Sequence, residues 1–204
     1  MAALSVAPEA FDAAALKRLR AAIVGSTHLK RDPLNRDFVG ARGFAVVFRA
    51  SERARVAREF PAFAAYLERA LDPGCNAFYL NPLLIAGGGR VDPHVDRSLR
   101  AYWKEVPVPL RVSVLYVEVP PGMAGGELVL RRGKRELARH RPAAGELVVF
   151  DGDLDHAITR VELAAGSKAE RISLVCEQYA LEPDELERVP AFALESGAGS
   201  RYGR

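Results

Sequence analysis

The order of hydrophobic and polar residues divides the chain into a helical first part and a β-rich second part. Apolar side chains recur at helical spacing over residues 11–23 and again over 51–71, where Pro61 predicts a kink or a break. Between them, the apolar pattern of 44–48 predicts a strand. We therefore expect residues 1–75 to form supporting helices and a first strand.

From residue 76 onward, short β-rich runs are separated by Gly and Pro. We predict eight strands, at 77–86, 91–96, 109–118, 126–131, 134–140, 146–150, 156–162 and 171–179. Because helical crossovers are missing between these runs, they predict a mainly β fold, a double-stranded β-helix of the jelly-roll or cupin-like type. The helices before residue 76 would buttress one sheet from outside.

Length and composition set the domain boundaries. A chain of 204 residues with 49% hydrophobic content can bury one sizeable core, so we expect a single domain over 1–204 with its barrel in 76–180. The segment 181–204 loses the apolar pattern and ends in SGAGSRYGR, which predicts a C-terminal extension with a mobile end.

The charge pattern gives no sign of a nucleic-acid or membrane partner. The net charge of +3 arises from 29 basic and 26 acidic residues that are mixed along the chain. The densest basic run, 131–135, surrounds Gly133 and predicts a solvated hairpin turn. No stretch resembles a membrane span or a secretion signal. We expect a cytoplasmic protein, with Cys75 and Cys176 as buried free thiols.

Three residues have the composition of a metal site. His94 and Asp96 are one residue apart, and an extended strand places such side chains on the same face. His156 follows another strand and could complete the site from a second wall of a barrel. Two imidazoles and one carboxylate can hold a divalent iron and leave the opposite positions open. His28 and His140 have no comparable neighbours, and we expect ordinary surface or loop residues there.

A second acidic pattern overlaps this site. Asp151, Asp153, Asp155 and Glu162 match the ligand spacing of a calcium-binding loop. However, His156 stands where that loop requires Gly, and the preceding residues predict a strand instead of a helix. We expect the aspartates to be turn residues, one of which could orient His156.

Arg171 adds a fixed cation whose forked donors match a carboxylate, as an organic acid cosubstrate would require. Ser173 lies two residues further on and shares its strand face. An arginine of this kind beside the histidines points to a site for metal and organic acid together.

The order of five motifs gives these residues a specific context. They are RVDPHVD (90–96), RVSVLYVEVP (111–120), GGELVL (125–130), AGELVVFDGDLDHAITRV (144–161) and RISLV (171–175). In this order they resemble the catalytic barrel of the iron(II)- and 2-oxoglutarate-dependent dioxygenases, especially the prolyl 4-hydroxylase branch. The resemblance covers about half of the chain.

The resemblance implies a role for each residue. His94, Asp96 and His156 would bind Fe(II), and Arg171 would anchor the distal carboxylate of 2-oxoglutarate beside Ser173. The Tyr116 hydroxyl would help to bind that carboxylate, or Tyr116 would only fill the barrel with its hydroxyl satisfied elsewhere. The implied reaction uses O2, releases succinate and CO2, and hydroxylates an aliphatic C–H of a small-molecule or peptide substrate, such as a prolyl or other amino-acid side chain. Related halogenases lack the carboxylate of Asp96, so hydroxylation is favoured over halogenation.

The sequence departs from the pattern of the family at three places. Ile85 stands where relatives often have a tyrosine, and Tyr79 on the same strand parity could compensate. The turn before Arg171 is enlarged and makes Lys168 a rival anchor, although Arg171 opens an apolar strand and can point inward. Glu177 replaces the second arginine of nucleic-acid repair members, which argues against that class.

Two questions stay open at this stage. A zinc hydrolase could use the same three ligands with an activated water, and a noncatalytic barrel could bind a ligand or partner without turnover. The hydrolase would have no need for an arginine on the adjoining wall, and the noncatalytic barrel would need neither oxygen access nor selectivity for iron. The loop 97–109, with Tyr102 and Trp103, could form a lid over substrate or could pack onto the barrel through its aromatic pair.

Overall fold

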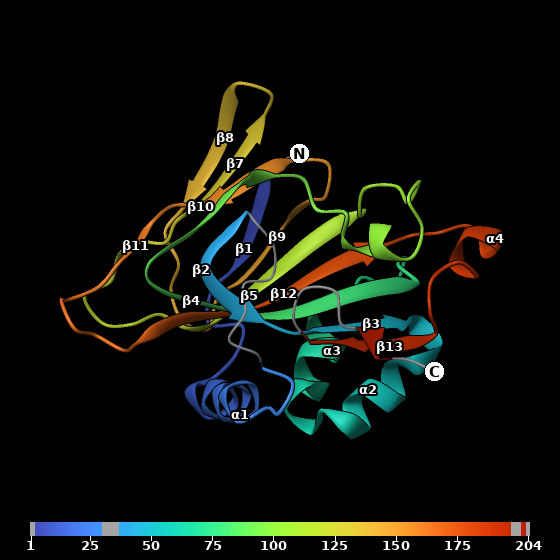
Figure 1. The fold of residues 1–204 in the computed structure, drawn as a ribbon, viewed down its shortest axis with the longest axis horizontal. Coiled ribbons are helices and arrows are strands. Elements are labelled where there is room, and N and C mark those ends of the chain that lie inside the picture. The colour runs from blue at the N-terminus through green and yellow to red at the C-terminus, as the bar shows by residue number, and fades with distance from the viewer. Residues whose placement is uncertain (1–2, 30–36, 197–200, 203–204) are drawn as a thin grey trace.

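One long strand, β4 (Ala77–His94), connects the two halves of the barrel in the computed structural model, which describes residues 3–29, 37–196 and 201–202 (Figure 1). Its first part pairs with β12 (Glu170–Tyr179), and its end pairs with β10 (Asp155–Ile158). Two separate strands were predicted here, but the backbone continues through the intervening glycines. A Cβ on Gly89 would lie 2.7 Å from Ile85 Cγ2 and 2.9 Å from the Gly40 carbonyl oxygen, so only glycine fits this crossing.

The main sheet is antiparallel throughout, which confirms the predicted mainly β jelly roll. Its principal path is β1 (Leu4–Ala7), β9 (Leu147–Asp151), β5 (Arg111–Glu118), β12, β4, β10, β7 (Leu128–Arg132) and β8 (Arg135–His140). Further strands pair off this path: β2 (Phe38–Gly43), β3 (Ala45–Arg49), β13 (Phe192–Glu195) and β14 (Arg201–Tyr202). A separate two-stranded sheet joins β6 (Ala124–Gly125) to β11 (Val161–Glu162).

The sequence analysis missed β1, β2, β6, β13 and β14, and the single strand predicted at 156–162 is divided into β10 and β11. β1 pairs with β9, and β13 pairs with β3, so both depend on partners far away in the chain. The predicted strand at 44–48 is present as β3. The expected mobility of the chain end concerns mainly 197–200 and 203–204, which lie outside the described residues.

The three helices before residue 76 lie together on one side of the barrel, as predicted, whereas α4 lies apart from them (Figure 1). Their bounds are α1 (Ala13–Val24), α2 (Arg53–Glu59) and α3 (Ala64–Ala70), with a short α4 (Pro183–Leu186) near the C-terminus. The described residues also form the 3₁₀ turns η1 (Ala50–Glu52), η2 (Pro61–Phe63) and η3 (Ser98–Ala101). Pro61 begins η2 between α2 and α3, which confirms the predicted break.

The helices and the sheet share one apolar core. The Asp12 side chain caps α1 by accepting a hydrogen bond of 2.7 Å from the Ala15 N–H, and this helix buries Leu19 and Ile23. These side chains belong to the same core cluster as Leu115 and Leu174 of β5 and β12. Burying a leucine or isoleucine side chain in this way contributes roughly 2 kcal/mol each. The packing fixes the outer face of β12, so that its alternate residues must face the barrel interior.

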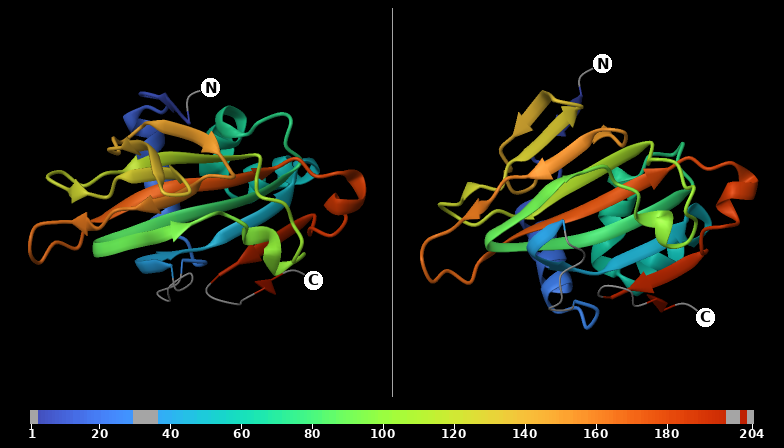
Figure 2. Two further views of the ribbon diagram at one scale, coloured as in Figure 1. Left: turned by 90° about the horizontal axis from the view of Figure 1, so that it is seen from above. Right: turned by 45° about the horizontal axis from the view of Figure 1, so that its top comes forward.

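The basic run at 131–135, the two cysteines and the helices agree with what composition predicted. The basic run lies at the turn of the β7–β8 hairpin, which projects from the barrel in the right-hand view of Figure 2, and Gly133 takes φ +60° there. Cys75 and Cys176 are buried free thiols, as predicted. Among the described residues, no helix has the length and apolar character needed to cross a membrane.

Candidate metal centre and its cavity

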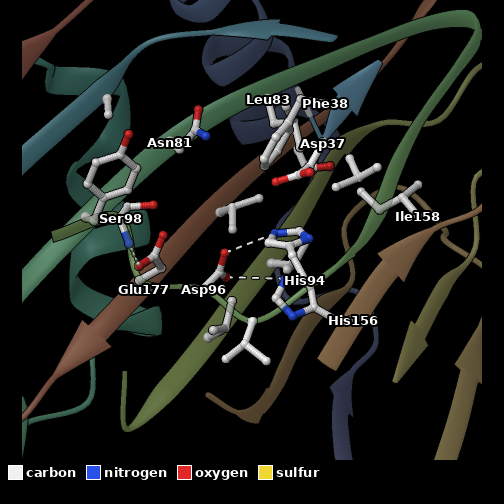
Figure 3. A pocket seen from close by; sticks show the side chains of 18 of the residues that line it. Asp37, Phe38, Asn81, Leu83, His94, Asp96, Ser98, His156, Ile158 and Glu177 are labelled. Atoms are coloured by element: carbon white, nitrogen blue, oxygen red, sulfur yellow. Dashed lines mark hydrogen bonds and ion pairs between the residues drawn. The ribbon is translucent and has the colours of Figure 1, made fainter. Parts of the chain in front are cut away.

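The fold brings His94, Asp96 and His156 together. His94 ends β4 and lies directly opposite His156 of β10, while Asp96 follows β4 as the chain leaves the sheet. The Nε2 atoms of His94 and His156 lie 3.3 and 3.4 Å from the two carboxylate oxygens of Asp96 (Figure 3). Within the described part of the chain, no other set of three or more His, Cys, Asp or Glu side chains converges in this way.

Backbone carbonyls orient both imidazole rings. His94 Nδ1 lies 2.9 Å from the Asp92 carbonyl oxygen, and His156 Nδ1 lies 3.2 Å from that of Leu154. Each Nδ1–H can therefore donate to the backbone, which leaves Nε2 facing Asp96. One of the turn aspartates was expected to orient His156. In the structure Leu154 does so through its carbonyl group.

The metal-free triad retains a proton. Burial lowers the pKa of His94, but the hydrogen bond and charge of Asp96 outweigh burial and raise it to about 9. Burial also raises the pKa of Asp96, but His156 and His94 outweigh that effect and hold this pKa well below its usual range. A negative carboxylate between two imidazoles has the charge and donor atoms that a divalent iron requires.

A cavity of about 340 Å³ adjoins the triad. Its walls include the inward faces of β4, β5 and β12. On β12, every second side chain lines the cavity: Arg171, Ser173, Val175 and Glu177. This arrangement follows from the period of two in a strand, because Ile172, Leu174 and Cys176 face the helix-covered core. One strand therefore places a basic and an acidic side chain in the same cavity.

Arg171 forms one end of the cavity. Its side chain is only 1% exposed, its Nη1 donates a hydrogen bond of 2.8 Å to Ser173 Oγ, and its guanidinium lies 5.0 Å from the centre of the Tyr116 ring. Among the described residues, no carboxylate forms an ion pair with Arg171, and neither its Nε nor the Tyr116 hydroxyl has a hydrogen-bond partner. Burial lowers the pKa of Arg171, an effect that Tyr116 partly offsets. A carboxylate ligand would supply the missing acceptor and countercharge.

The other candidates for binding the cosubstrate, Lys168 and Tyr79, do not lie beside Arg171 in the cavity. Lys168 is exposed in the turn before β12 and does not line the cavity. Ile85 pairs with Arg171 across the sheet, whereas Tyr79 pairs with Glu177. The Tyr79 hydroxyl donates a hydrogen bond of 3.3 Å to Glu195, so this tyrosine is not placed to compensate for Ile85 beside Arg171.

Glu177 lies near the other end of the same row. It is 3% exposed, and its Oε2 accepts hydrogen bonds from the Ser98 N–H at 3.0 Å and from the Tyr179 hydroxyl. Burial, followed by the charge of Asp96, raises the pKa of Glu177 to about 8. The sequence analysis used Glu177 only to argue against nucleic-acid repair. Its parity with Arg171 and Ser173 was the signal that could have identified it as a cavity residue.

Two histidines were expected to be ordinary, and the structure corrects this for His140. It is half-buried on β8, its Nε2 lies 2.8 Å from Glu146 Oε2, and its ring stacks on Tyr116 with centroids 5.8 Å apart. His28 lies in a loop, as predicted, with its ring near Phe44 and Phe60. His140 therefore supports Tyr116 from the side of the hairpin.

The aromatic pair of the loop 97–109 packs onto the barrel. Tyr102 and Trp103 pack against a buried cluster that includes Leu99 and Tyr179, and the Tyr102 hydroxyl donates a hydrogen bond of 2.5 Å to Glu195. Of the two alternatives for this loop, the packing role is the one that these contacts support.

The calcium-like pattern forms a β-turn region, as expected. Asp151 ends β9, Asp155 begins β10, and Asp153 forms an ion pair of 3.0 Å with Arg132 of the hairpin. These aspartates do not converge on a common point.

Comparison with known proteins places the fold. No protein-family model matches the chain, and no curated protein sequence matches it. A prolyl-4-hydroxylase from Pseudomonas putida is similar in structure, with a TM-score of 0.57 and 18% identity over 89% of this chain and 95% of that chain. An oxidoreductase of the 2OG-Fe(II) oxygenase family from Burkholderia pseudomallei gives a TM-score of 0.55 and 17% identity over 98% and 89%.

A third similar structure is the viral collagen prolyl hydroxylase of Paramecium bursaria Chlorella virus-1, solved with 2-oxoglutarate. Its TM-score is 0.52 and its identity 14%, over 88% of this chain and 97% of that chain. The chain therefore has the barrel fold of these oxygenases, which confirms the fold that the motif order implied.

Proposed function

We propose that this protein is an Fe(II)- and 2-oxoglutarate-dependent oxygenase. It would hydroxylate an aliphatic C–H of a prolyl or other amino-acid side chain, free or within a peptide, and release succinate and CO2. The shared barrel fold and the donor set of His94, Asp96 and His156 support this proposal. His94, Asp96 and His156 would hold the iron, while Arg171, Ser173 and Tyr116 would hold the distal carboxylate of 2-oxoglutarate.

The observation that carries the proposal is the buried guanidinium of Arg171 without an acidic partner among the described residues, in the cavity that adjoins the triad. Burying an unpaired charge costs several kcal/mol, so a residue of this kind indicates a ligand of opposite charge. A zinc hydrolase would need the triad but not this cation. An organic acid cosubstrate needs both.

The protein's contribution to the reaction is to orient groups and exclude water. Bound iron, with 2-oxoglutarate and O2, supplies the oxidising power that inserts oxygen into a C–H bond. The Asp92 and Leu154 carbonyls keep both imidazole Nε2 atoms directed at the metal position. Apolar side chains such as Leu83, Val114 and Val175 line the cavity between the polar groups and limit access of water.

Anaerobic titration tests the proposal directly. Fe(II) is added to the metal-free protein, followed by 2-oxoglutarate, and the visible charge-transfer band of the chelate is recorded. We expect a saturable band that requires both additions. Tight binding of zinc without any such band for iron and 2-oxoglutarate would contradict the proposal.

A further inference from the structure

Glu177 lies on the side of Asp96 that faces away from the two histidine rings of the metal triad. In Figure 3, Asp96 separates Glu177 and Ser98 from His94 and His156. Glu177 lines the cavity from β12, and Tyr79, its partner across the sheet, lines it from β4. This part of the cavity is therefore distinct from the Arg171 end, where 2-oxoglutarate would bind.

The Glu177 carboxyl group is buried and has hydrogen-bond donors but no cationic partner among the described residues. The hydrogen bonds from the Ser98 N–H and the Tyr179 hydroxyl reach Oε2. The Ser98 side chain also hydrogen-bonds the carboxyl group, but within the described ranges no Lys, Arg or His forms an ion pair with it. A buried carboxyl group without a cationic partner keeps its proton, and a cation bound in the cavity that Glu177 lines would favour the ionised form and pair with it.

The surroundings of Glu177 favour a positive ligand. Glu195 also lines this part of the cavity and accepts hydrogen bonds from Tyr79 and Tyr102. Tyr79 pairs with Glu177 across the sheet and donates to Glu195, and two carboxyl groups beside a tyrosine are groups that can bind an ammonium or guanidinium ion. The exposed Arg97 and Arg100 line the cavity too, but among the described residues neither forms an ion pair with Glu177.

We propose that Glu177 binds a positively charged nitrogen of the substrate, so that the substrate is an amine, a cyclic amine or a guanidine compound. This inference rests on the proposed function and names the substrate class for the same site. It favours free amino acids or basic side chains over the uncharged prolyl residue of a peptide. Glu177 would be a specificity-determining residue, because an uncharged analogue would leave its carboxylate unpaired.

A purely structural role for Glu177 makes a different prediction. If Glu177 only anchored η3 through Ser98, Glu177→Gln would change little, because the amide oxygen can still accept the Ser98 N–H and the Tyr179 hydroxyl. The same substitution removes the group that can ionise and pair with a cation. The variant therefore separates anchoring of the loop from recognition of a cation.

Matched ligand pairs provide the test. The pairs are L-lysine with L-norleucine, L-arginine with L-citrulline, and L-proline with N-acetyl-L-proline. Calorimetry measures the binding of each compound to the metal-free protein and to the anaerobic Fe(II)–2-oxoglutarate complex. In at least one pair, we expect the first member, which carries one more positive charge, to bind the complex at least about 30-fold more tightly than its partner, and Glu177→Gln to remove most of that preference.

Glu187→Gln is the matched control, because it makes the same chemical change at an exposed residue away from the cavity. It should leave the preference unchanged. Equal binding of both members of every pair, absence of binding by the first member of every pair, or a preference that survives in Glu177→Gln would overturn the inference.

The failure of this inference differs from failure of the proposed function. Absence of the 2-oxoglutarate band in the wild-type protein would reject the oxygenase proposal, whatever the amines do. Calorimetry with the metal-free protein then still tests Glu177, since a preference that Glu177→Gln removes supports its role and equal binding contradicts it. A normal 2-oxoglutarate charge-transfer band, together with equal binding of both members of every ligand pair, would reject the proposed substrate class and leave the oxygenase proposal intact.

Discussion

The two charged positions of β12 differ in sign and in the way the protein holds them. Arg171 and Glu177 share one strand face, are 1% and 3% exposed, and line one cavity that adjoins the metal triad. Arg171 is held within the sheet by Ser173 and Tyr116, whereas Glu177 is held by the backbone of η3 and by Tyr179. A single strand thus offers a cationic and an anionic binding position.

This difference suggests that the two ends of the cavity bind different molecules, the cosubstrate at Arg171 and the substrate at Glu177. The Arg171 end is built from neighbouring strands of the main sheet, which suits a cosubstrate that is the same in every reaction cycle. The Glu177 side includes the loop that follows Asp96, and loops are the parts of a barrel that vary with specificity. Substitutions of a metal ligand, of either charged residue or of the residues that support them test this difference between the two ends of the cavity.

The largest effect is expected from removing the carboxylate between the two histidines. Asp96→Ala should weaken binding of a divalent metal by at least about 100-fold, because it removes one of three ligands and the charge between two imidazoles. Competition with a chromogenic chelator measures this affinity. Asp92→Asn is the control, since it keeps the backbone carbonyl that contacts His94. Near-normal metal binding by Asp96→Ala would show that the triad is not the metal site.

Removing the cation should affect the cosubstrate and spare the metal. Arg171→Ala should weaken 2-oxoglutarate binding by about 100-fold, which corresponds to roughly 3 kcal/mol for a charge-assisted buried contact. Iron affinity should change less than about twofold, since Arg171 lies outside the triad. The charge-transfer band gives both affinities. Lys168→Ala is the control, and a larger effect from it than from Arg171→Ala would reverse the assignment of the anchor.

Metal affinity should rise with pH. The pKa of His94 is raised to about 9 in the metal-free protein, so its imidazole holds a proton that a metal must displace. Affinity should therefore increase about tenfold per pH unit up to pH 9 and then level off. Calorimetry of zinc binding in two buffers of different ionisation enthalpy should detect release of about one proton at pH 7.5. No proton release would mean that the imidazoles of the free site are already neutral.

The smallest effect is expected at the hydroxyl beside Arg171. Tyr116→Phe should weaken 2-oxoglutarate binding by about fivefold, because it removes one neutral hydrogen-bond donor worth about 1 kcal/mol. Tyr66→Phe also removes a buried hydroxyl, one that lies 2.9 Å from Ser113 Oγ and outside the cavity lining. It should lower thermal stability without changing the 2-oxoglutarate titration. Equal titrations for Tyr116→Phe and wild type would remove Tyr116 from the cosubstrate site.

The sequence by itself determined the features that arise from local pattern. Helical spacing identified the helices on either side of β3, and Pro61 marked the break between α2 and α3. Motif order implied the barrel, and the residue types of His94, Asp96, His156 and Arg171 indicated a site for metal and organic acid. These predictions depend on neighbouring residues and on the chemistry of single side chains, which are visible without coordinates.

Only the tertiary structure decided which distant residues meet. It joined two predicted strands into β4 through Gly89, added β1 and β13 at sheet edges, and stacked His140 on Tyr116. It also placed Glu177 in the cavity with Arg171. The period of two along β12 gave these residues the same face, but the helix packing on Ile172, Leu174 and Cys176 decided that this face is the interior of the barrel.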